Sequence, residues 1–161
     1  MRSHISDMST LSDEVQLLEC NLDDMTAEAM GFTMDRLLSA GALDVWFTPI
    51  QMKKNRPAVT LAVLASVERA GELAALLLRE TTTLGVRRAL VDRLKAGRES
   101  IVVQTPWGDV HAKVKHLAGR PVLAQPEYED CAALARERGV PFVDVYAAAQ
   151  AAALAVVRGE A

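Results

Sequence analysis

Apolar and polar positions in the first half of the chain follow the periods of strands and helices in turn. Residues 14–22 form an apolar run that ends at two aspartates, which predicts a strand. The next apolar residues have a helical period, so we expect an amphipathic helix that is capped by Asp24 or Thr26 and ends before Gly41. Its apolar stripe consists of Met30, Met34, Leu37 and Leu38.

Three further strands and a second helix complete this half. Residues 42–50 alternate between apolar and polar, and residues 58–66 and 81–91 are the next β-rich runs. A helix over residues 67–80 separates the last two strands. Its apolar stripe consists of Val67, Ala70, Leu73 and Leu77. The order predicts a ferredoxin-like βαββαβ subdomain over residues 14–96, with both helices on one face of a four-stranded antiparallel sheet.

The second half, residues 97–161, has a different pattern. Alternating segments flank Trp107-Gly108, which indicates a β-hairpin, and residues 121–125 form another short apolar run. Two helices should follow. The predicted fold class is therefore α+β, with a smaller subdomain of a hairpin and two helices after the ferredoxin-like one.

Prolines and glycines mark the ends of those last two helices. Pro126 is expected at the first position of one helix, which ends at Gly139. Pro141 opens the final alanine-rich helix, which runs to about Val157. Residues 1–13 are polar and aperiodic, so we expect a disordered leader there.

Composition narrows the possible functions. The 161 residues are 50% hydrophobic but only 4% aromatic, so Leu, Val, Ala and Met must fill the core. A net charge of −3 argues against a nucleic-acid binder. No run is long enough to cross a membrane and no signal peptide is recognisable. Cys20 and Cys131 form no CxxC pair, and free thiols without an export signal indicate the cytoplasm.

Two polar clusters end the first strand and join the second strand to the third. Asp23 and Asp24 are adjacent carboxylates that suit magnesium or manganese, although helix capping is the better account on charge alone. Lys53, Lys54 and Arg56 are cations crowded into four residues, which an anionic triphosphate would relieve. The alternative for this cluster is a solvated turn.

Two more polar clusters lie beside predicted helix ends. Three hydroxyls and two arginines follow the second helix, and both kinds of side chain bind phosphate, although this is not a P-loop. They are Thr81, Thr82, Thr83, Arg87 and Arg88. Three acids crowd the start of a later helix, where helix capping and a functional role, either a metal site or a nucleotide-base contact, are equally good accounts. They are Glu127, Glu129 and Asp130.

The same clusters carry a resemblance to a known family. The stretches ECNLDDMTAEAMG, GALDVWFTPIQMKKNRP, ETTTLGVR and PEYEDCAALA resemble the C-terminal domain of LarC-type nickel insertion proteins, the pyridinium-3,5-bisthiocarboxylic acid mononucleotide nickel chelatases. The similarity runs from about Val15 to about Ala149. Several specific blocks in the right order make a chance match improbable.

The resemblance implies a role in building the nickel-pincer cofactor of lactate racemase. Such enzymes, lyases of the chelatase or cyclometallase kind, insert nickel into the pyridinium bisthiocarboxylate mononucleotide while CTP is hydrolysed to CMP and pyrophosphate. The C-terminal domain would bind CTP with magnesium or manganese and form homo-oligomers, either trimers or hexamers. The family's N-terminal half, with its own metal-binding residues, would be a partner, so we expect this chain alone to be incomplete for nickel insertion.

Residue roles within that function come from charge alone. The basic and hydroxyl clusters are the nucleotide candidates, and the acidic clusters are the candidates for the divalent metal. An alternative function is a non-catalytic module for oligomerisation or ligand sensing, which many ferredoxin-like domains provide. An RNA-binding role is the weakest hypothesis, because too few aromatic residues are present for base stacking.

Overall fold

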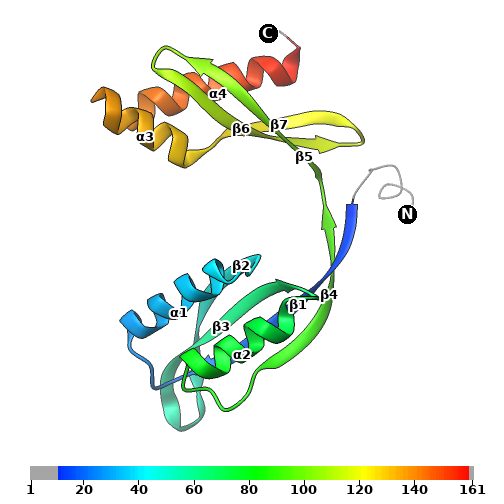
Figure 1. Ribbon diagram of the computed structural model, residues 1–161, viewed down its shortest axis with the longest axis vertical. Helices are drawn as coiled ribbons and strands as arrows, with labels where there is room; N and C mark the ends of the chain where they lie inside the picture. The colour runs from blue at the N-terminus through cyan, green and yellow to red at the C-terminus, as the bar shows by residue number, and fades with distance from the viewer. Residues whose placement is uncertain (1–10, 160–161) are drawn as a thin grey trace. The chain divides into compact units, whose positions relative to one another are not determined.

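A computed structural model describes residues 11–159 of the chain (Figure 1). It contains two compact units, and the first spans Ser12–Arg93. The second includes the chain from Leu94 onward. The leader expected over residues 1–13 lies mostly outside the described residues, and the first strand already begins at Leu11. Nowhere in the described part does a helix combine the length and apolar character that a membrane span needs.

The first unit is a four-stranded antiparallel sheet with two helices, as the sequence predicts. Its strands run in the spatial order β2-β3-β1-β4, the ferredoxin-like arrangement. The strands are β1 (Leu11–Leu22), β2 (Asp44–Met52), β3 (Arg56–Ser66) and β4 (Arg87–Lys95). The helices are α1 (Ala27–Ser39) and α2 (Ala70–Glu80). A short 3₁₀ turn at Lys53–Asn55 joins β2 to β3.

Alternate residues of the central strands meet both helices in one core. Strand β1 contributes Leu18, Cys20 and Leu22, and the helices contribute Leu37 and Leu73 among others. Because successive strand residues point to opposite faces, the residues between them lie on the face that the helices leave open. Polar residues on that open face contribute to the candidate site.

The apolar stripes predicted for the two helices are confirmed except at two positions. Leu38 is 46% exposed, and Thr33 is buried in its place. The Thr33 hydroxyl lies 2.9 Å from the carbonyl oxygen of Ala29 and 3.2 Å from that of Glu80, so it ties α1 to the end of α2. Val67 is 40% exposed because it precedes α2, which begins only at Ala70.

The second unit is a three-stranded antiparallel sheet in the order β5-β6-β7, covered by two helices. The strands are β5 (Gly97–Thr105), β6 (Gly108–Leu117) and β7 (Arg120–Pro126). The helices are α3 (Tyr128–Arg138) and α4 (Phe142–Arg158). The hairpin predicted at Trp107-Gly108 is present, and the Thr105 hydroxyl donates to the Gly108 carbonyl at 2.7 Å.

The start of α3 corrects one prediction. Pro126 is the last residue of β7, where it pairs with Ala112, and it is not the first residue of the helix. The Glu127 amide donates to the His111 carbonyl at 2.7 Å, which extends the strand pairing past the proline. A proline fits the end of a strand because its missing N–H is not needed there. Gly139 does end α3, with a left-handed φ of 64°.

Candidate functional site

Three of the four polar clusters lie at one end of the four-stranded sheet. This is the end where β1 leads into α1, where the β2–β3 hairpin turns, and where the loop from α2 enters β4 (Figure 1). The antiparallel order of the strands brings these connections together, although they are far apart in the sequence. The candidate residues from Asp23 to Arg87 therefore lie at the same end of this sheet.

An ion pair joins the first two clusters. Arg56 Nη1 lies 3.0 Å from Asp23 Oδ2. The strand register explains the contact: Leu22, the last residue of β1, pairs with Val59, so Arg56 lies just beyond the end of β1. Asp23 is 22% exposed and Arg56 is 55% exposed, so water and ligands reach both groups.

The threonine cluster forms a loop and not the start of a strand. Strand β4 begins at Arg87, so the strand predicted over residues 81–91 starts too early. The Thr81 hydroxyl donates to the Leu77 carbonyl at 2.6 Å, and the Thr83 hydroxyl donates to the Gly85 carbonyl at 2.9 Å. Such local bonds between side chain and backbone favour turns over strand pairing.

One threonine links this loop to the first cluster. The Thr82 hydroxyl donates to Oδ1 of Asp24. Asp24 is exposed and follows β1, whereas Thr82 follows α2. The two loops that frame this end of the sheet are thus joined through a carboxylate and a hydroxyl.

Arg87 reaches the same end along the open face of the sheet. Its Nη2 donates to Asn21 Oδ1 at 2.8 Å, and its Nε lies 3.9 Å from Glu19 Oε2. The Thr60 hydroxyl donates to the same Asn21 oxygen at 3.1 Å. Asn21 is a site residue that the sequence reasoning missed. The available signal was that Glu19 and Asn21 alternate as polar residues within an otherwise apolar strand.

Arg88 does not join this group. Adjacent strand residues point to opposite faces, so Arg87 and Arg88 diverge. Arg88 instead donates to Gln16 Oε1 from Nε at 3.0 Å and from Nη2 at 2.7 Å. Lys53 and Lys54 are exposed at the hairpin tip, and within residues 11–159 neither has a polar partner. Lys54 has a left-handed φ of 60°.

A buried thiol lies beneath the site. Cys20 is fully buried, and this burial raises the pKa of its thiol. The nearby Arg87 charge opposes the shift without cancelling it. Cys20 is therefore a neutral core residue and not a nucleophile.

The fourth cluster belongs to the second unit, and two of its three acids have basic partners. Lys113 Nζ lies 2.5 Å from Glu127 Oε1. Asp130 Oδ2 accepts the His111 amide at 2.8 Å and lies 2.7 Å from His111 Nδ1. The hydrogen bond from the His111 backbone, followed by that from its ring, lowers the pKa of Asp130. Glu129 is exposed.

The five metal candidates are therefore divided between two units. Asp23 and Asp24 lie in the first, whereas Glu127, Glu129 and Asp130 lie in the second. Within the described residues, no three His, Cys, Asp or Glu side chains are grouped to hold a metal. The Asp23 and Asp24 pair still fits magnesium or manganese, because such ions commonly take one or two carboxylates and fill other positions with water and phosphate.

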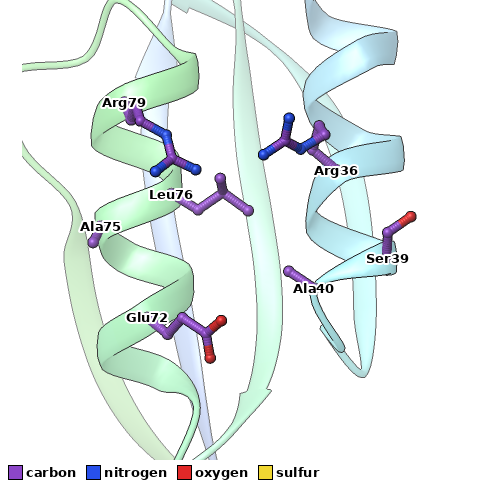
Figure 2. A pocket seen from close by; sticks show the side chains of 7 residues that line it. All are labelled: Arg36, Ser39, Ala40, Glu72, Ala75, Leu76 and Arg79. Atoms are coloured by element: carbon purple, nitrogen blue, oxygen red, sulfur yellow. The ribbon is translucent and has the colours of Figure 1, made fainter.

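A separate groove lies between the two helices of the first unit. It has a volume of about 420 Å³. Arg36 of α1 and Arg79 of α2 extend toward each other across it (Figure 2). Arg36 Nη2 lies 3.7 Å from Glu80 Oε1, and Arg79 Nε lies 3.2 Å from the same atom. This carboxylate therefore partly neutralises both arginines. None of the predicted site residues lines this groove.

Comparison with known proteins decides the family. The sequence matches the family described as nickel insertion protein over residues 1–146. The chain belongs to the nickel insertion protein family. Its membership confirms the resemblance that the sequence blocks carry.

Two curated members of this family are 43% and 49% identical to the chain. It is 49% identical over 138 residues to the pyridinium-3,5-bisthiocarboxylic acid mononucleotide nickel insertion protein of Lactiplantibacillus plantarum, covering 86% of this chain and 33% of that protein. It is 43% identical over 148 residues to the protein of the same name from Geobacillus kaustophilus, covering 92% and 36%. The chain thus spans about a third of the length of these curated relatives.

A solved structure matches the fold closely. It is LarC2, described as the C-terminal domain of a cyclometallase involved in the synthesis of the NPN cofactor of lactate racemase, in the apo form. The TM-score is 0.83 at 48% identity, and the match covers 88% of this chain and 98% of that structure. The family's C-terminal domain and this chain therefore share one α+β fold.

Proposed function

We propose that this chain is the CTP- and metal-binding domain of a cytoplasmic enzyme that inserts nickel into the pincer nucleotide cofactor of lactate racemase. Related proteins are named for nickel insertion into pyridinium-3,5-bisthiocarboxylic acid mononucleotide, and the similar structure is a cyclometallase domain. Because the chain spans a third of such relatives, the complete lyase reaction belongs to the longer enzyme. Nickel and the mononucleotide are its substrates, and CTP is hydrolysed to CMP and pyrophosphate.

The convergence of basic and hydroxyl side chains around Asp23 and Asp24 is the observation that carries this proposal. Arg56 and Arg87 already contact oxygen atoms at this end of the sheet. Lys53 and Lys54 add two exposed positive charges at the hairpin tip. A triphosphate offers many anionic oxygens, and guanidinium and ammonium groups bind such oxygens through charge-assisted hydrogen bonds.

The acids and bases of the site have complementary roles in the proposal. Asp23 and Asp24 hold magnesium or manganese, and the bound ion neutralises part of the triphosphate charge. Arg56 then turns from Asp23 to a phosphate oxygen. Thr82, which now donates to Asp24, provides a hydroxyl at the same place. Since the carboxylates repel phosphate without the ion, CTP and metal should strengthen each other's binding.

The remaining candidate residues do not all belong to the phosphate site or the metal site. Arg88 binds Gln16 and supports the strand, so it is not part of the phosphate site. Glu127 and Asp130 contact Lys113 and His111 in the other unit, so the metal role rests on Asp23 and Asp24. We also propose that the chain assembles as a homo-oligomer and works with the rest of the longer enzyme.

Paired variants test the phosphate assignment. Arg87→Ala should weaken CTP binding roughly tenfold, because one charge-assisted contact is lost. Arg88→Ala removes the neighbouring arginine and should change CTP affinity less than twofold, so it is the matched control. Calorimetric titration with CTP and Mg²⁺ gives both values. Equal effects of the two substitutions would show that the arginines act only through general charge.

Lys54→Ala extends the test to the hairpin tip and should also weaken CTP binding several-fold. If neither Lys54→Ala nor Arg87→Ala changes the affinity, this end of the sheet is not the nucleotide site. A wild-type chain that binds no nucleotide at all would favour the alternative, a non-catalytic oligomerisation or ligand-sensing module.

A further inference from the structure

The open face of the three-stranded sheet in the second unit is basic. Strand β6 buries Val110, Ala112 and Val114 against the helices. By the alternation of strand side chains, the residues between and beyond them point to the other face. These residues are His111, Lys113 and Lys115. The central strand therefore presents three basic side chains in succession on the face opposite its buried residues, and His111, at one end of this row, is paired with Asp130 in the first turn of α3.

The strand register places another cation directly beside them. Arg98 of β5 is the Cα partner of Lys115, so two positive charges lie opposite each other on adjacent strands. Like charges in this position destabilise a sheet. On the other side of Lys115 lies Leu123 of β7, and Lys113 is flanked by Ser100 and Gln125. An anion bound over this face would relieve the repulsion.

The nearby carboxylate does not balance these charges. Glu127 lies 2.5 Å from Lys113 Nζ, while Arg98 Nη2 is 4.0 Å from the same Oε1 atom. One carboxylate is thus shared by two cations. Lys115 is exposed and has no ion-pair partner in the part of the chain that the structure describes.

A cleft of about 210 Å³ opens on this face. Its lining includes Arg98, Lys113, Lys115, Gln125 and Leu123. Pockets that enclose a whole drug-sized ligand measure roughly 300–1,000 Å³, so this cleft suits a smaller charged group with part of a sugar or ring beside it. Leu123 is 41% exposed and offers an apolar surface next to the cations.

We propose that Arg98, Lys113 and Lys115 form a second anion site, which binds the phosphate of the mononucleotide substrate. The identity of the substrate rests on the proposed function, and the site consists of residues of the second unit, whereas the triphosphate candidates belong to the first. A mononucleotide carries a phosphate monoester that two or three ammonium and guanidinium groups would bind. Gln125 and Ser100 provide neutral polar groups beside the phosphate, and Glu127 positions the Lys113 ammonium.

Nicotinic acid mononucleotide, a pyridinium carboxylic acid mononucleotide, is a suitable probe. Titration of the wild-type chain should show saturable binding, measured by calorimetry and by ³¹P NMR of the phosphate. Lys113→Gln combined with Lys115→Gln should weaken that binding roughly tenfold or more. Lys115→Arg keeps the charge and should retain most of the affinity. Arg120→Gln removes an exposed cation elsewhere on the same sheet and is the matched control.

Parallel CTP titrations separate this proposal from the proposed function. The Lys113/Lys115 double variant should bind CTP with unchanged affinity, whereas Arg87→Ala should leave the mononucleotide affinity unchanged. The second site is overturned if the wild-type chain binds CTP but not the mononucleotide, or if Arg87→Ala abolishes binding of both. Absence of CTP binding alone would count against the first site and leave this one standing. If the double variant fails to fold, the single variant Lys115→Gln replaces it. Its affinity for the mononucleotide should be at least threefold lower than that of the wild type, and an unchanged affinity would overturn the proposal.

Discussion

Arg87 of β4 donates from Nη2 to Asn21 Oδ1 of β1 over 2.8 Å, and this contact holds the arginine at the end of the sheet where the other candidates gather. Asn21 also accepts a hydrogen bond from the Thr60 hydroxyl at 3.1 Å, so its amide oxygen is fixed between two strands. A guanidinium held in this way loses less freedom when it binds a phosphate. Asn21 is therefore a positioning residue for the proposed site.

Asn21→Ala tests this positioning role. It should reduce CTP affinity roughly three- to tenfold, since Arg87 loses its anchor. The thermal midpoint should fall little, because the side chain is only partly buried. Calorimetry with CTP and Mg²⁺ measures the first effect and differential scanning measures the second. Gln16→Ala, which removes the partner of Arg88, is the control, and an equal loss of affinity there would refute a specific role for Asn21.

Thr33→Val tests the link between α1 and α2. Valine has nearly the same shape but cannot donate to the carbonyl oxygens of Ala29 and Glu80. We expect the free energy of unfolding to fall by about 1–3 kcal/mol, because a buried hydrogen bond is lost. Urea denaturation followed by circular dichroism measures it. Thr48 is exposed, so Thr48→Val is the control and should change the free energy of unfolding by less than about 0.5 kcal/mol. An equally small change for Thr33→Val would contradict the hydrogen bonding of the Thr33 hydroxyl.

Asp130 should make stability depend on pH in the acidic range. Its folded pKa is lowered from the ordinary 3.8 by the hydrogen bonds from His111. Its stabilising contribution is thus complete above the unfolded pKa and is lost as the pH falls through the folded pKa. Asp130→Asn should lower the thermal midpoint at pH 7, and the difference from the wild type should shrink below pH 3.8. A difference that stays constant from pH 7 to pH 2 would show that the carboxylate charge is irrelevant.

Both cysteines should be chemically silent in the folded chain. Burial raises the pKa of the thiols of Cys20 and Cys131, and only the thiolate reacts rapidly with disulfide reagents. Ellman's reagent at pH 8 should therefore label neither residue until a denaturant is added. Rapid labelling of one equivalent in the native chain would reveal an accessible thiol, and Cys20→Ser and Cys131→Ser would identify which one.

The sequence predicts the βαββαβ order well because alternation and helical period arise from burial itself. Leu18, Cys20 and Leu22 alternate because one face of β1 meets the helices. The predicted strand over residues 81–91 starts too early for a physical reason. Threonine favours strands because it is β-branched, but the Thr81 and Thr83 hydroxyls donate hydrogen bonds to nearby backbone carbonyls and stabilise a loop instead.

The site was predicted less completely than the fold. The convergence of Asp23, Arg56 and Thr82 depends on strand order, which individual clusters do not reveal. Arg87 and Arg88 are the same type of residue, and they differ only in the face of the sheet on which each side chain lies. Asn21 carries no charge, so charge patterns could not identify it.

The most direct test of the central claim is calorimetric titration of the wild-type chain with CTP in the presence of Mg²⁺ or Mn²⁺, with ATP and GTP as controls. The account predicts micromolar binding of CTP, much weaker binding of the other two nucleotides, and loss of CTP affinity when the metal is chelated. Equal affinity for all three nucleotides, or no binding of CTP with either metal, would contradict it.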